Sequence, residues 1–375
     1  MKMIDLAIMP HAPPTKGIEM HPKVSSLRKK SSSTSLHQAS LLRHLNTRVV
    51  LEALQKYGAL SRADISRITG ISGPTITRTV KDLLDDKLVE EGEPIRNQLG
   101  RPGKVIRMAS SKVIVVGVVL EKGLAQICSA GLNGEASSEI ESFSIPQNYD
   151  ELISQLSSAI KGRKSKAGQR ILGVGVILNA LVHSKDQSVL SCPELPFLEN
   201  RKFAKDLSSA TGLEMVLCKP AMGLCLAERL LREMPDLLNF ALVDIRNGFD
   251  VGVIADGKPL EGHAGLALNF HPDGFSGEAS YASEMATNPN ILLEHLANRL
   301  EQVLRIFNPE KLYLTSDLLP DRPELINHLA DLLKQKELPE VYHSCEIKLA
   351  MAKPNQASIA AIITALTTGR KHTIR

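Results

Sequence analysis

The sequence predicts an α/β protein in which an N-terminal winged helix-turn-helix precedes a body of two α/β lobes. Three observations support this fold class. The region up to residue 110 contains three short amphipathic helical segments, followed by a hairpin that carries Gly and Pro. The remaining sequence alternates strand-like apolar runs with amphipathic helical segments, and this scheme occurs twice. The chain has 375 residues, 43% of them hydrophobic, which is enough apolar material for more than one core.

Residues 1–40 are expected to form a disordered basic arm. They contain four Pro and a Lys-, Arg- and Ser-rich run from Lys23 to Ser35, without hydrophobic periodicity. Such a segment cannot bury enough apolar surface to offset its chain entropy. Its basic residues leave two interpretations open, a solvated tail and an arm that contacts phosphates.

Residues 41–110 are predicted to form a winged helix-turn-helix domain that binds DNA. Apolar residues recur at helical spacing from Asn46 to the stop signal at Gly58. Ser61 is placed to cap a second short helix, with an acidic residue three positions later as in a capping box. Ser72 is placed to cap a third helix that has Pro in its first turn.

The third helix is the predicted recognition helix. Its apolar residues repeat at helical spacing from Ile76 to Leu84, which leaves the opposite face to short or cationic side chains. Such side chains can donate hydrogen bonds in the major groove, while the basic hairpin after Lys87 lies along the flanking backbone. The residues predicted to contact DNA are Arg62, Ser72, Thr75, Thr77, Arg78, Lys81, Arg101 and Lys104.

Charge is distributed unevenly between this head and the body. Of the 45 Lys and Arg and the 41 Asp and Glu, 18 and 10 lie in residues 1–110. The first 110 residues therefore carry a formal charge of +8, and the rest of the chain carries −4. A basic head on an acidic body indicates a polyanionic partner for the head, here double-stranded DNA. A head that docks a protein is the alternative, although its exposed face would then be more apolar.

The body is predicted to consist of a first lobe over residues 111–235 and a second lobe over residues 236–375 with a closing C-terminal helix. The expected strands are Val113–Leu120, Leu124–Ala130, Ile171–Leu178, Glu214–Cys218, Ala241–Ile245, Val251–Ala255 and Lys311–Leu314. The expected helices are Tyr149–Lys161, Arg201–Thr211, Ala221–Arg232, Ile291–Ile306, Glu324–Lys334 and Gln356–Leu366. Two such lobes usually hold a small ligand in the cleft between them.

The sequence pattern excludes several classes of protein. No run of 18 or more apolar residues occurs, and the N-terminus lacks the uninterrupted apolar segment of a secretory leader. The five Cys are odd in number, scattered and without a C-x-x-C pair, which is typical of buried thiols in a reducing compartment. We therefore expect a cytoplasmic protein with no membrane contact and no disulfide framework.

Short motifs recur along the chain in a defined order. They are Gly100-Arg101-Pro102-Gly103, Val116-Gly117-Val118, Leu195-Pro196-Phe197, Leu226-Ala227-Glu228, Gly252 to Gly257, Gly262 with Ala264-Gly265, and Glu278 to Ser283. In this order they resemble the ROK family (repressor, open reading frame, kinase) in its repressor branch, from about Leu41 to the C-terminus. The resemblance implies a DNA-binding head on an actin-like, sugar-kinase-like body with the ribonuclease H-like ATPase fold, usually dimeric or tetrameric.

Motifs of the family's kinases are missing at the positions that the resemblance assigns to them. The D-x-G-x-T phosphate hairpin is replaced by residues 118–123, and the catalytic Asp by Pro220, which cannot accept a proton. The G-T-G-x-G-x-G phosphate loop is replaced by residues 246–252, in which Asp250 would repel a phosphate. Because phosphoryl transfer needs both phosphate binding and a base, no catalytic residue and no enzymatic activity are expected.

The family's zinc and sugar ligands are also missing from the aligned positions. Residues 268–278 contain no Cys, the zinc-binding His aligns with Asn269, and the sugar-contacting Glu aligns with Leu266. His263 and His271 lie nearby, but two His without a third ligand make a poor zinc site, so no metal and no cofactor are expected. Polar residues expected near the cleft that match no family sugar ligand are Asn179, His183, Asn269 and His271.

The sequence thus supports one leading hypothesis, a DNA-binding transcriptional regulator of the ROK type. Because members of the family usually repress transcription, the resemblance implies a repressor of carbohydrate-metabolism genes. Its catalytically inactive body would serve assembly into a homodimer or homotetramer, and it would be able to sense a sugar or a sugar derivative. The alternatives are a sugar kinase with a DNA-binding head and a protein-docking scaffold.

Overall fold

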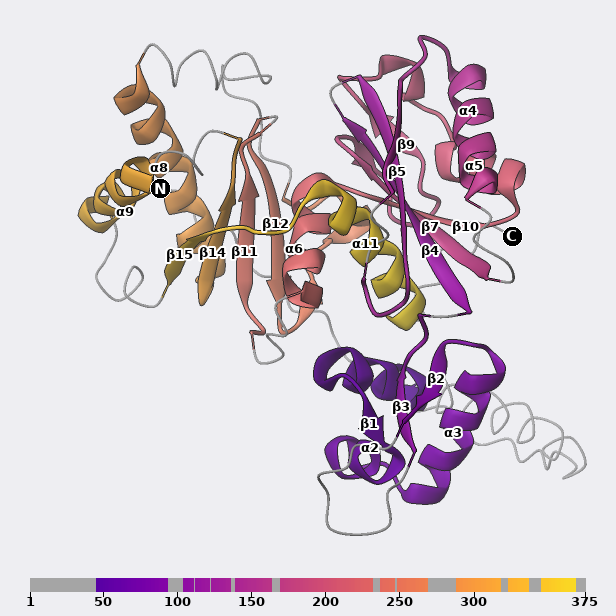
Figure 1. The fold of residues 1–375 in the computed structure, drawn as a ribbon. Helices are drawn as coiled ribbons and strands as arrows, with labels where there is room; N and C mark the ends of the chain where they lie inside the picture. Colours follow the sequence, from indigo (N-terminus) through magenta and orange to yellow (C-terminus); the bar gives the residue numbers. More distant parts are fainter. Residues whose placement is uncertain are drawn as a thin grey trace, which may run out of the picture. The chain divides into compact units, whose positions relative to one another are not determined.

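The computed structural model describes residues 45–93, 104–110, 112–121, 123–135, 139–163, 169–231, 237–246, 248–268, 288–317, 323–336 and 345–368 (Figure 1). The described residues from Leu45 onward belong to one compact unit. The predicted arm of residues 1–40 and the tip of the predicted wing, residues 94–103, lie outside the described residues.

The head has the predicted winged-helix order of elements. They are a helical segment over residues 45–57, β1 (Leu60–Ser61), α2 (Arg62–Thr69), α3 (Gly73–Asp85), β2 (Val89–Gly92) and β3 (Val105–Met108). In its described part, three antiparallel strands pair in the order β1-β3-β2. The Ser61 hydroxyl accepts a hydrogen bond from the Asp64 amide at 3.1 Å, which confirms the predicted cap of α2. β1 was not predicted, because two residues carry no periodicity.

The first lobe contains a mixed sheet. Its strands are β4 (Val113–Glu121), β5 (Leu124–Ala130), β6 (Glu141–Ser144), β7 (Arg170–Leu178) and β10 (Glu214–Cys218), and its helices include α4 (Tyr149–Gly162) and α5 (Phe203–Thr211). Among the described residues five strands pair in the order β10-β7-β4-β5-β6. The two pairs on the β10 side are parallel, and the two pairs on the β6 side are antiparallel. A short hairpin of β8 (Leu181–Val182) and β9 (Val189–Ser191) lies outside this sheet.

The second lobe repeats the same scheme, as the sequence predicts. Its strands are β11 (Phe240–Asp244), β12 (Asp250–Ala255), β13 (Lys258–Pro259), β14 (Lys311–Thr315) and β15 (Glu346–Leu349), and its helices include α8 (Pro289–Phe307) and α9 (Pro323–Lys336). In the described part of this lobe, the order β13-β12-β11-β14-β15 has the same succession of antiparallel and parallel pairs as the first sheet. The predicted fold class, a winged helix followed by a two-lobed α/β body, is confirmed.

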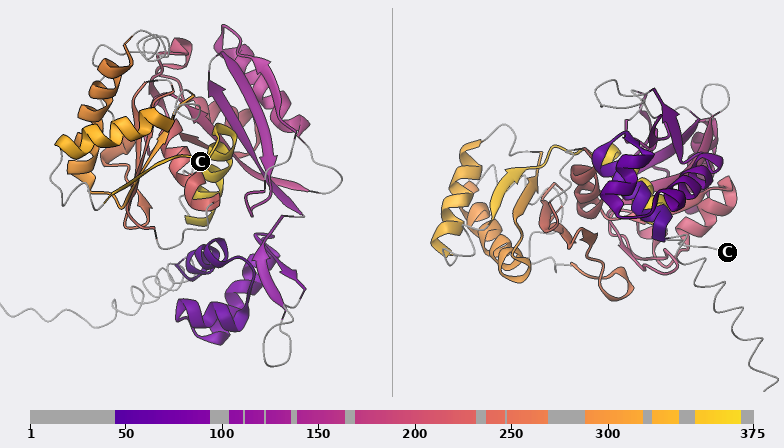
Figure 2. Two further views of the ribbon diagram at one scale, coloured as in Figure 1. Left: turned by 60° about the vertical axis from the view of Figure 1, so that its left-hand side comes forward. Right: turned by 90° about the horizontal axis from the view of Figure 1, so that it is seen from below.

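The central strand β4 separates two layers of the first lobe's core. Successive side chains of a strand point to opposite faces of the sheet. Val116 and Val118 lie in one buried cluster with residues of α4 and α5, which cover that face of the sheet (Figures 1 and 2). Val113 and Val119 are buried on the opposite face, in clusters that contain residues of α11 (Pro354–Thr368). The sheet is therefore covered on both faces, which explains why its central strands are apolar almost throughout.

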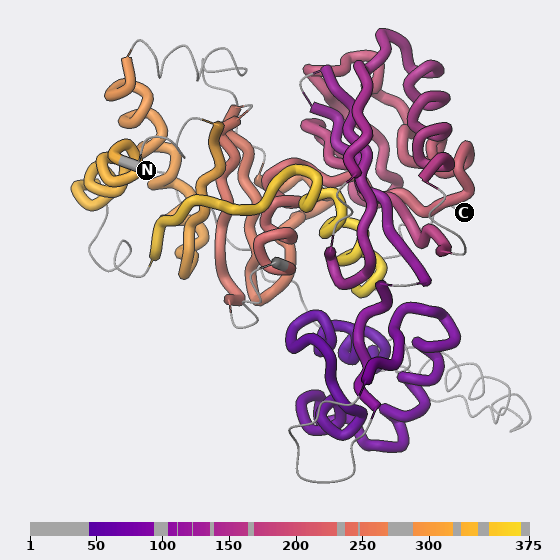
Figure 3. Tube along the Cα trace, in the orientation of Figure 1, coloured from indigo at the N-terminus to yellow at the C-terminus, as the bar shows by residue number. Residues whose placement is uncertain are grey.

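Two helices cross between the lobes. The helix α6 (Pro220–Leu231) lies in the sequence range of the first lobe but packs on β11 and β12 of the second lobe. The helix α11 lies in the sequence range of the second lobe but packs on β4 and β7 of the first, and the two helices pack on each other. Figure 3 shows α11, in yellow, beside the strands of the first lobe. The C-terminal helix that was predicted to close the second lobe therefore completes the core of the first.

Glycine residues in the strands let these two helices approach the sheets closely. A Cβ on Gly117 would lie 2.1 Å from Ser358 Oγ, and one on Gly175 would lie 2.0 Å from the Ser358 carbonyl oxygen. On the second lobe, a Cβ on Gly252 would lie 2.6 Å from the carbonyl oxygen of Ala221 in α6. Because a helix backbone cannot move aside as the end of a flexible side chain can, Gly175 and Gly252 are positions that require glycine. The atoms nearest to a Cβ on Gly117 belong to side chains.

The substitution Gly175→Ala should destabilise the fold. Its Cβ would overlap the backbone of α11, and overpacking of this kind costs about 1–3 kcal/mol. Urea unfolding of the full chain would measure this loss in the free energy of unfolding. Gly162→Ala is the matched control, because a Cβ at the end of α4 meets no atom within 4 Å. Equal stability of the two variants would contradict the proposed role of the close approach.

Candidate functional site

The recognition helix α3 has a buried face and an exposed face. Ile76, Val80 and Leu83 are buried at helical spacing in the core of the head, as predicted. Thr77, Arg78 and Lys81 are exposed, and Thr75 is half-buried. The structure thus brings four of the predicted DNA-contacting side chains to one side of a single helix.

The hydroxyl groups at the start of α3 are arranged differently from the prediction. Ser72 occupies the N-cap position, but its side chain makes no hydrogen bond to a helix amide, so the predicted hydroxyl cap is wrong. Its Oγ lies 2.9 Å from Thr75 Oγ1 instead. Pro74 explains part of this difference, because it removes one of the two amides that an N-cap side chain normally accepts from. The Thr77 hydroxyl donates to the Gly73 carbonyl oxygen at 2.9 Å, so Thr77 offers its methyl group and an acceptor oxygen.

The cations on α3 differ from those on the neighbouring elements in having no protein partner among the described residues. No described residue forms an ion pair or hydrogen bond with the side chain of Arg78 or Lys81. Asp82, Asp85 and Asp86 occupy the C-terminal end of the helix. The N-terminal half of α3, where the helix dipole is positive, is therefore the part suited to a DNA groove.

Arg62 and Lys104 are held by one carboxylate. Arg62 Nη2 lies 3.0 Å from Glu91 Oε1, and Lys104 Nζ lies 2.6 Å from Glu91 Oε2. The hydrogen bonds from Lys104 and then Arg62 lower the pKa of Glu91, so it stays ionised at neutral pH. Glu91 is the residue of this surface that sequence reasoning missed. The sequence contained an indication of this role. Because side chains alternate along a strand, Glu90 points toward Arg107 and Glu91 points to the opposite side.

Arg101 lies outside the described residues, as do Asn269 and His271. Of the remaining polar candidates for the cleft, the Asn179 amide donates to Glu194 Oε1 at 2.8 Å. His183 Nδ1 lies 3.1 Å from Asp186 Oδ1. Both side chains thus have local protein partners. Among the described residues, no group of three His, Cys, Asp or Glu side chains could hold a metal ion.

Arg246 joins the two segments that are predicted to align with the family's phosphate-binding loops. Its guanidinium donates to both carboxylate oxygens of Asp244, at 3.0 and 2.6 Å, and lies 3.4 Å from Glu121 at the end of β4. The Asp244 side chain is 3% exposed and that of Arg246 is 9% exposed. Burial raises the pKa of Asp244, although the hydrogen bonds from Arg246 oppose this shift. The end of β4 in the first lobe and the segment that follows β11 in the second lobe are thus joined by an ion pair.

Asp250 also has partners inside the protein. Its Oδ1 lies 3.1 Å from Lys219 Nζ, and its Oδ2 accepts a hydrogen bond from the Ala221 amide at 2.9 Å. The carboxylate therefore binds the N-terminal end of α6, where the helix dipole favours a negative charge. Pro220, which is predicted to align with the family's catalytic Asp, is the first residue of this helix. The described segment from Cys218 to Met222 offers no carboxylate at that point.

No helix in the described part of the chain has the length and apolar character needed to cross a membrane. All five Cys are free thiols, and four of them are buried. For three of these thiols burial raises the pKa to about 11 or 12; they are Cys192, Cys218 and Cys345. Such thiols are poor metal ligands and poor nucleophiles at neutral pH.

Two protein families match separate parts of the chain. Residues 123–270 match the ROK family, and residues 38–96 match the MarR family. The chain is thus similar to the ROK family over part of its length and to the MarR family over a segment that precedes it.

Similar curated proteins include transcriptional regulators. The xylose repressor of Caldicellulosiruptor bescii is 22% identical over 245 residues, which cover 62% of this chain and 61% of that protein. The DNA-binding transcriptional dual regulator NagC of Escherichia coli is 22% identical over 230 residues, which cover 60% of this chain and 56% of NagC. The chain thus spans about 60% of the length of these relatives.

Solved structures share the fold. A ROK family transcriptional regulator described as a homologue of the Escherichia coli Mlc protein superposes with a TM-score of 0.74 at 18% identity, over 88% of this chain and 97% of that one. The ROK hexokinase of Thermus thermophilus superposes with a TM-score of 0.56 at 17% identity, over 68% of this chain and 99% of the hexokinase. The regulator therefore matches the head as well as the body, whereas the kinase covers a smaller part of the chain.

Proposed function

We propose that the chain is a DNA-binding transcriptional regulator, because one part of it matches the ROK family and a segment before that part matches the MarR family. The observation that carries the proposal is the exposed side of α3, on which Arg78 and Lys81 have no partner among the described residues. Cations left without protein partners can release counterions by binding phosphates and can donate to base edges. The relatives named as repressors favour repression as the direction of control.

We propose that the body has no kinase activity. Pro220 stands where the family's catalytic base aligns, and a pyrrolidine ring cannot take a proton from a sugar hydroxyl. Arg246 and Asp250, in the aligned phosphate loop, are engaged with Glu121 and Lys219. Both requirements of phosphoryl transfer, a base and a free phosphate cradle, are thus unmet by these residues. The hypothesis of a kinase with a DNA-binding head is therefore less well supported than that of a regulator.

Assembly and location belong to the same proposal. A homodimer or homotetramer would present two recognition helices to a pseudo-palindromic operator. A regulator of this kind acts in the cytoplasm, where bacterial DNA lies. A sugar or sugar derivative as effector stays a prediction from the resemblance. The protein-docking scaffold is disfavoured, because the exposed face of α3 carries polar and charged side chains rather than apolar ones.

Arg78→Ala should weaken binding to the operator by about 1–3 kcal/mol and relax the preference at one base pair. Arginine commonly makes two hydrogen bonds to guanine in the major groove, and alanine makes none. The operator would be selected from random duplex DNA by the wild-type protein, and affinities would be measured by gel shift. Arg305→Ala, which removes an exposed cation from α8, is the control. An equal loss on every sequence would assign Arg78 to the DNA backbone, and no loss would contradict the interface.

Glu91→Gln should strengthen binding to all duplex sequences. The substitution removes the carboxylate that neutralises Arg62 and Lys104, so both cations become available to phosphates. The slope of log affinity against log salt concentration should steepen by about one unit for each cation that is released. Glu324→Gln, the same charge change in the second lobe, should leave affinity and slope unchanged. A weaker or unchanged affinity of Glu91→Gln would show that this pair of cations does not face the DNA.

A coupled ADP-release assay should give only the background rate for the wild-type protein with ATP and hexoses or amino sugars. Pro220→Asp restores a carboxylate but leaves the bridge between Arg246 and Glu121, so it should also give background. A ROK hexokinase serves as the positive control. Sugar-dependent ADP release by the wild-type protein would overturn the proposed loss of activity.

A further inference from the structure

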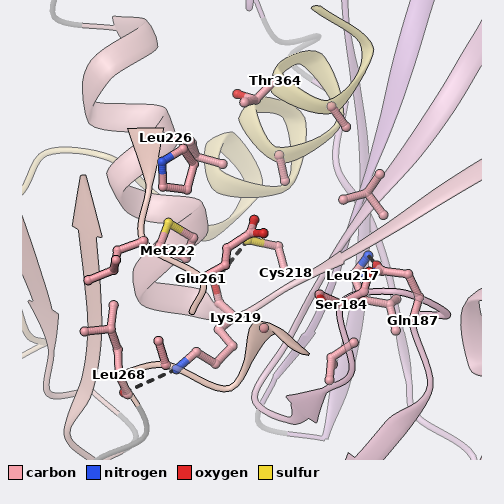
Figure 4. Close-up of a pocket in the computed structure, with 18 of the residues that line it drawn as sticks. Ser184, Gln187, Leu217, Cys218, Lys219, Met222, Leu226, Glu261, Leu268 and Thr364 are labelled. Carbon is pink, nitrogen blue, oxygen red and sulfur yellow. Dashed lines mark hydrogen bonds between the residues drawn. The ribbon is translucent and has the colours of Figure 1, made fainter. Parts of the chain in front are cut away.

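A cavity of about 110 Å³ lies between the lobes, where the end of β10 meets α6 and α11 (Figure 4). Its wall is mainly apolar, and side chains that form it include Val216, Met222, Leu226, Val251, Leu260 and Ala361. These residues come from the first lobe, from the second lobe and from both crossing helices. A ligand in this cavity would therefore contact each part of the body.

The polar groups in the cavity wall mostly have protein partners. Lys219 Nζ pairs with Asp250 Oδ1 at 3.1 Å, and Figure 4 shows its side chain directed toward the second lobe. Gln187 Oε1 accepts a hydrogen bond from the Leu217 amide at 2.7 Å. Burial, together with the nearby carboxylates, raises the pKa of Cys218 to about 12, so this residue is a neutral thiol at physiological pH. The groups that would otherwise bind a polar ligand are thus already used.

Two hydroxyls of the wall, those of Ser184 and Thr364, have no hydrogen-bond partner among the described residues (Figure 4). The hydroxyl of Thr364 belongs to α11. A sugar would bring several hydroxyls into this space, and each buried hydroxyl without a partner costs about 1–3 kcal/mol. An apolar molecule with one polar group avoids this cost.

We propose that this cavity binds a small, neutral, largely apolar molecule, such as a phenol or a short alcohol, with its polar group on Thr364. The size agrees with this class, because a dry apolar cavity of about 150 Å³ in another protein accepts benzene. The ligand differs from the sugar that the family resemblance implies, because the wall that it meets is apolar.

The same helix connects the cavity to the head. Ala365 lines the cavity and also belongs to the buried cluster that contains Ile362 of α11 and Val50 and Leu54 of the head. A molecule that fills the cavity therefore contacts α11, the helix that packs against the core of the head. A change in DNA affinity on ligand binding follows from this contact, and this part of the inference rests on the proposed function.

The test is calorimetric titration of the full-length protein with phenol and toluene, and with glucose, xylose and N-acetylglucosamine as contrasts. Phenol and toluene should bind and raise the melting temperature, whereas the sugars should do neither. Thr364→Val should weaken phenol binding about three- to tenfold, the worth of one hydrogen bond, and leave toluene binding unchanged. Thr368→Val, one turn further along α11 and outside the cavity wall, is the matched control. Ala361→Leu should fill the space and abolish binding of both probes.

Several outcomes would overturn the inference. Binding of a sugar but not of phenol, or of none of the probes, would reject the ligand class. Phenol binding that survives both Thr364→Val and Ala361→Leu would locate it elsewhere. Phenol binding without any change in DNA affinity would reject the connection to the head but not the cavity. Because calorimetry needs no DNA, failure of the proposed function would appear separately, as absent operator binding.

Discussion

The close packing of α11 on the glycine-bearing strands of the first lobe is the constraint on which the rest of the structure depends. Gly175 brings the backbone of this helix against β7, and Gly117 leaves space on β4 for side chains of the helix, so its position has little freedom. The helix in turn packs on α6, which lies on the sheet of the second lobe. Its isoleucine residues share a buried cluster with the core of the head. One helix at the end of the sequence therefore contacts all three parts of the chain, and tightly packed contacts transmit displacement because they cannot deform gradually.

The charged groups of the body and those on the exposed side of α3 differ in whether they have protein partners. In the body, buried charges are compensated by partners close by: Arg246 has Asp244 and Glu121, and Asp250 has Lys219 and the start of α6. A buried charge without such a partner would cost several kcal/mol, so these groups are held inside the protein. On the exposed side of α3, water solvates the cations and no such compensation is needed. The cations of α3 are consequently exposed to solvent, whereas Arg246 and Asp250 in the body are engaged by protein groups.

The functional surface of the head was predicted in part. The helical spacing of Ile76, Val80 and Leu83 was sufficient to assign Arg78 and Lys81 to the exposed face, because local periodicity determines which side of a helix is buried. The role of Glu91 was not visible, since Arg62 and Lys104 are distant from each other in sequence and meet only when the strands pair. The missing cap of Ser72 was also not predictable from the sequence, because the hydrogen-bond partner of this hydroxyl depends on the exact geometry of the first helical turn.

The sequence by itself determined the order of the elements, the repeated α/β scheme and the winged helix, because hydrophobic periodicity, caps and glycine stops are local properties of the chain. The proposal that the family's kinase motifs are missing also comes from the sequence, since it concerns residue identities. Only the tertiary structure decided which sheet each crossing helix covers and how the cleft is lined. Those features arise from contacts between residues that lie more than a hundred positions apart, such as Gly175 and Ser358, and no local pattern specifies such a pairing.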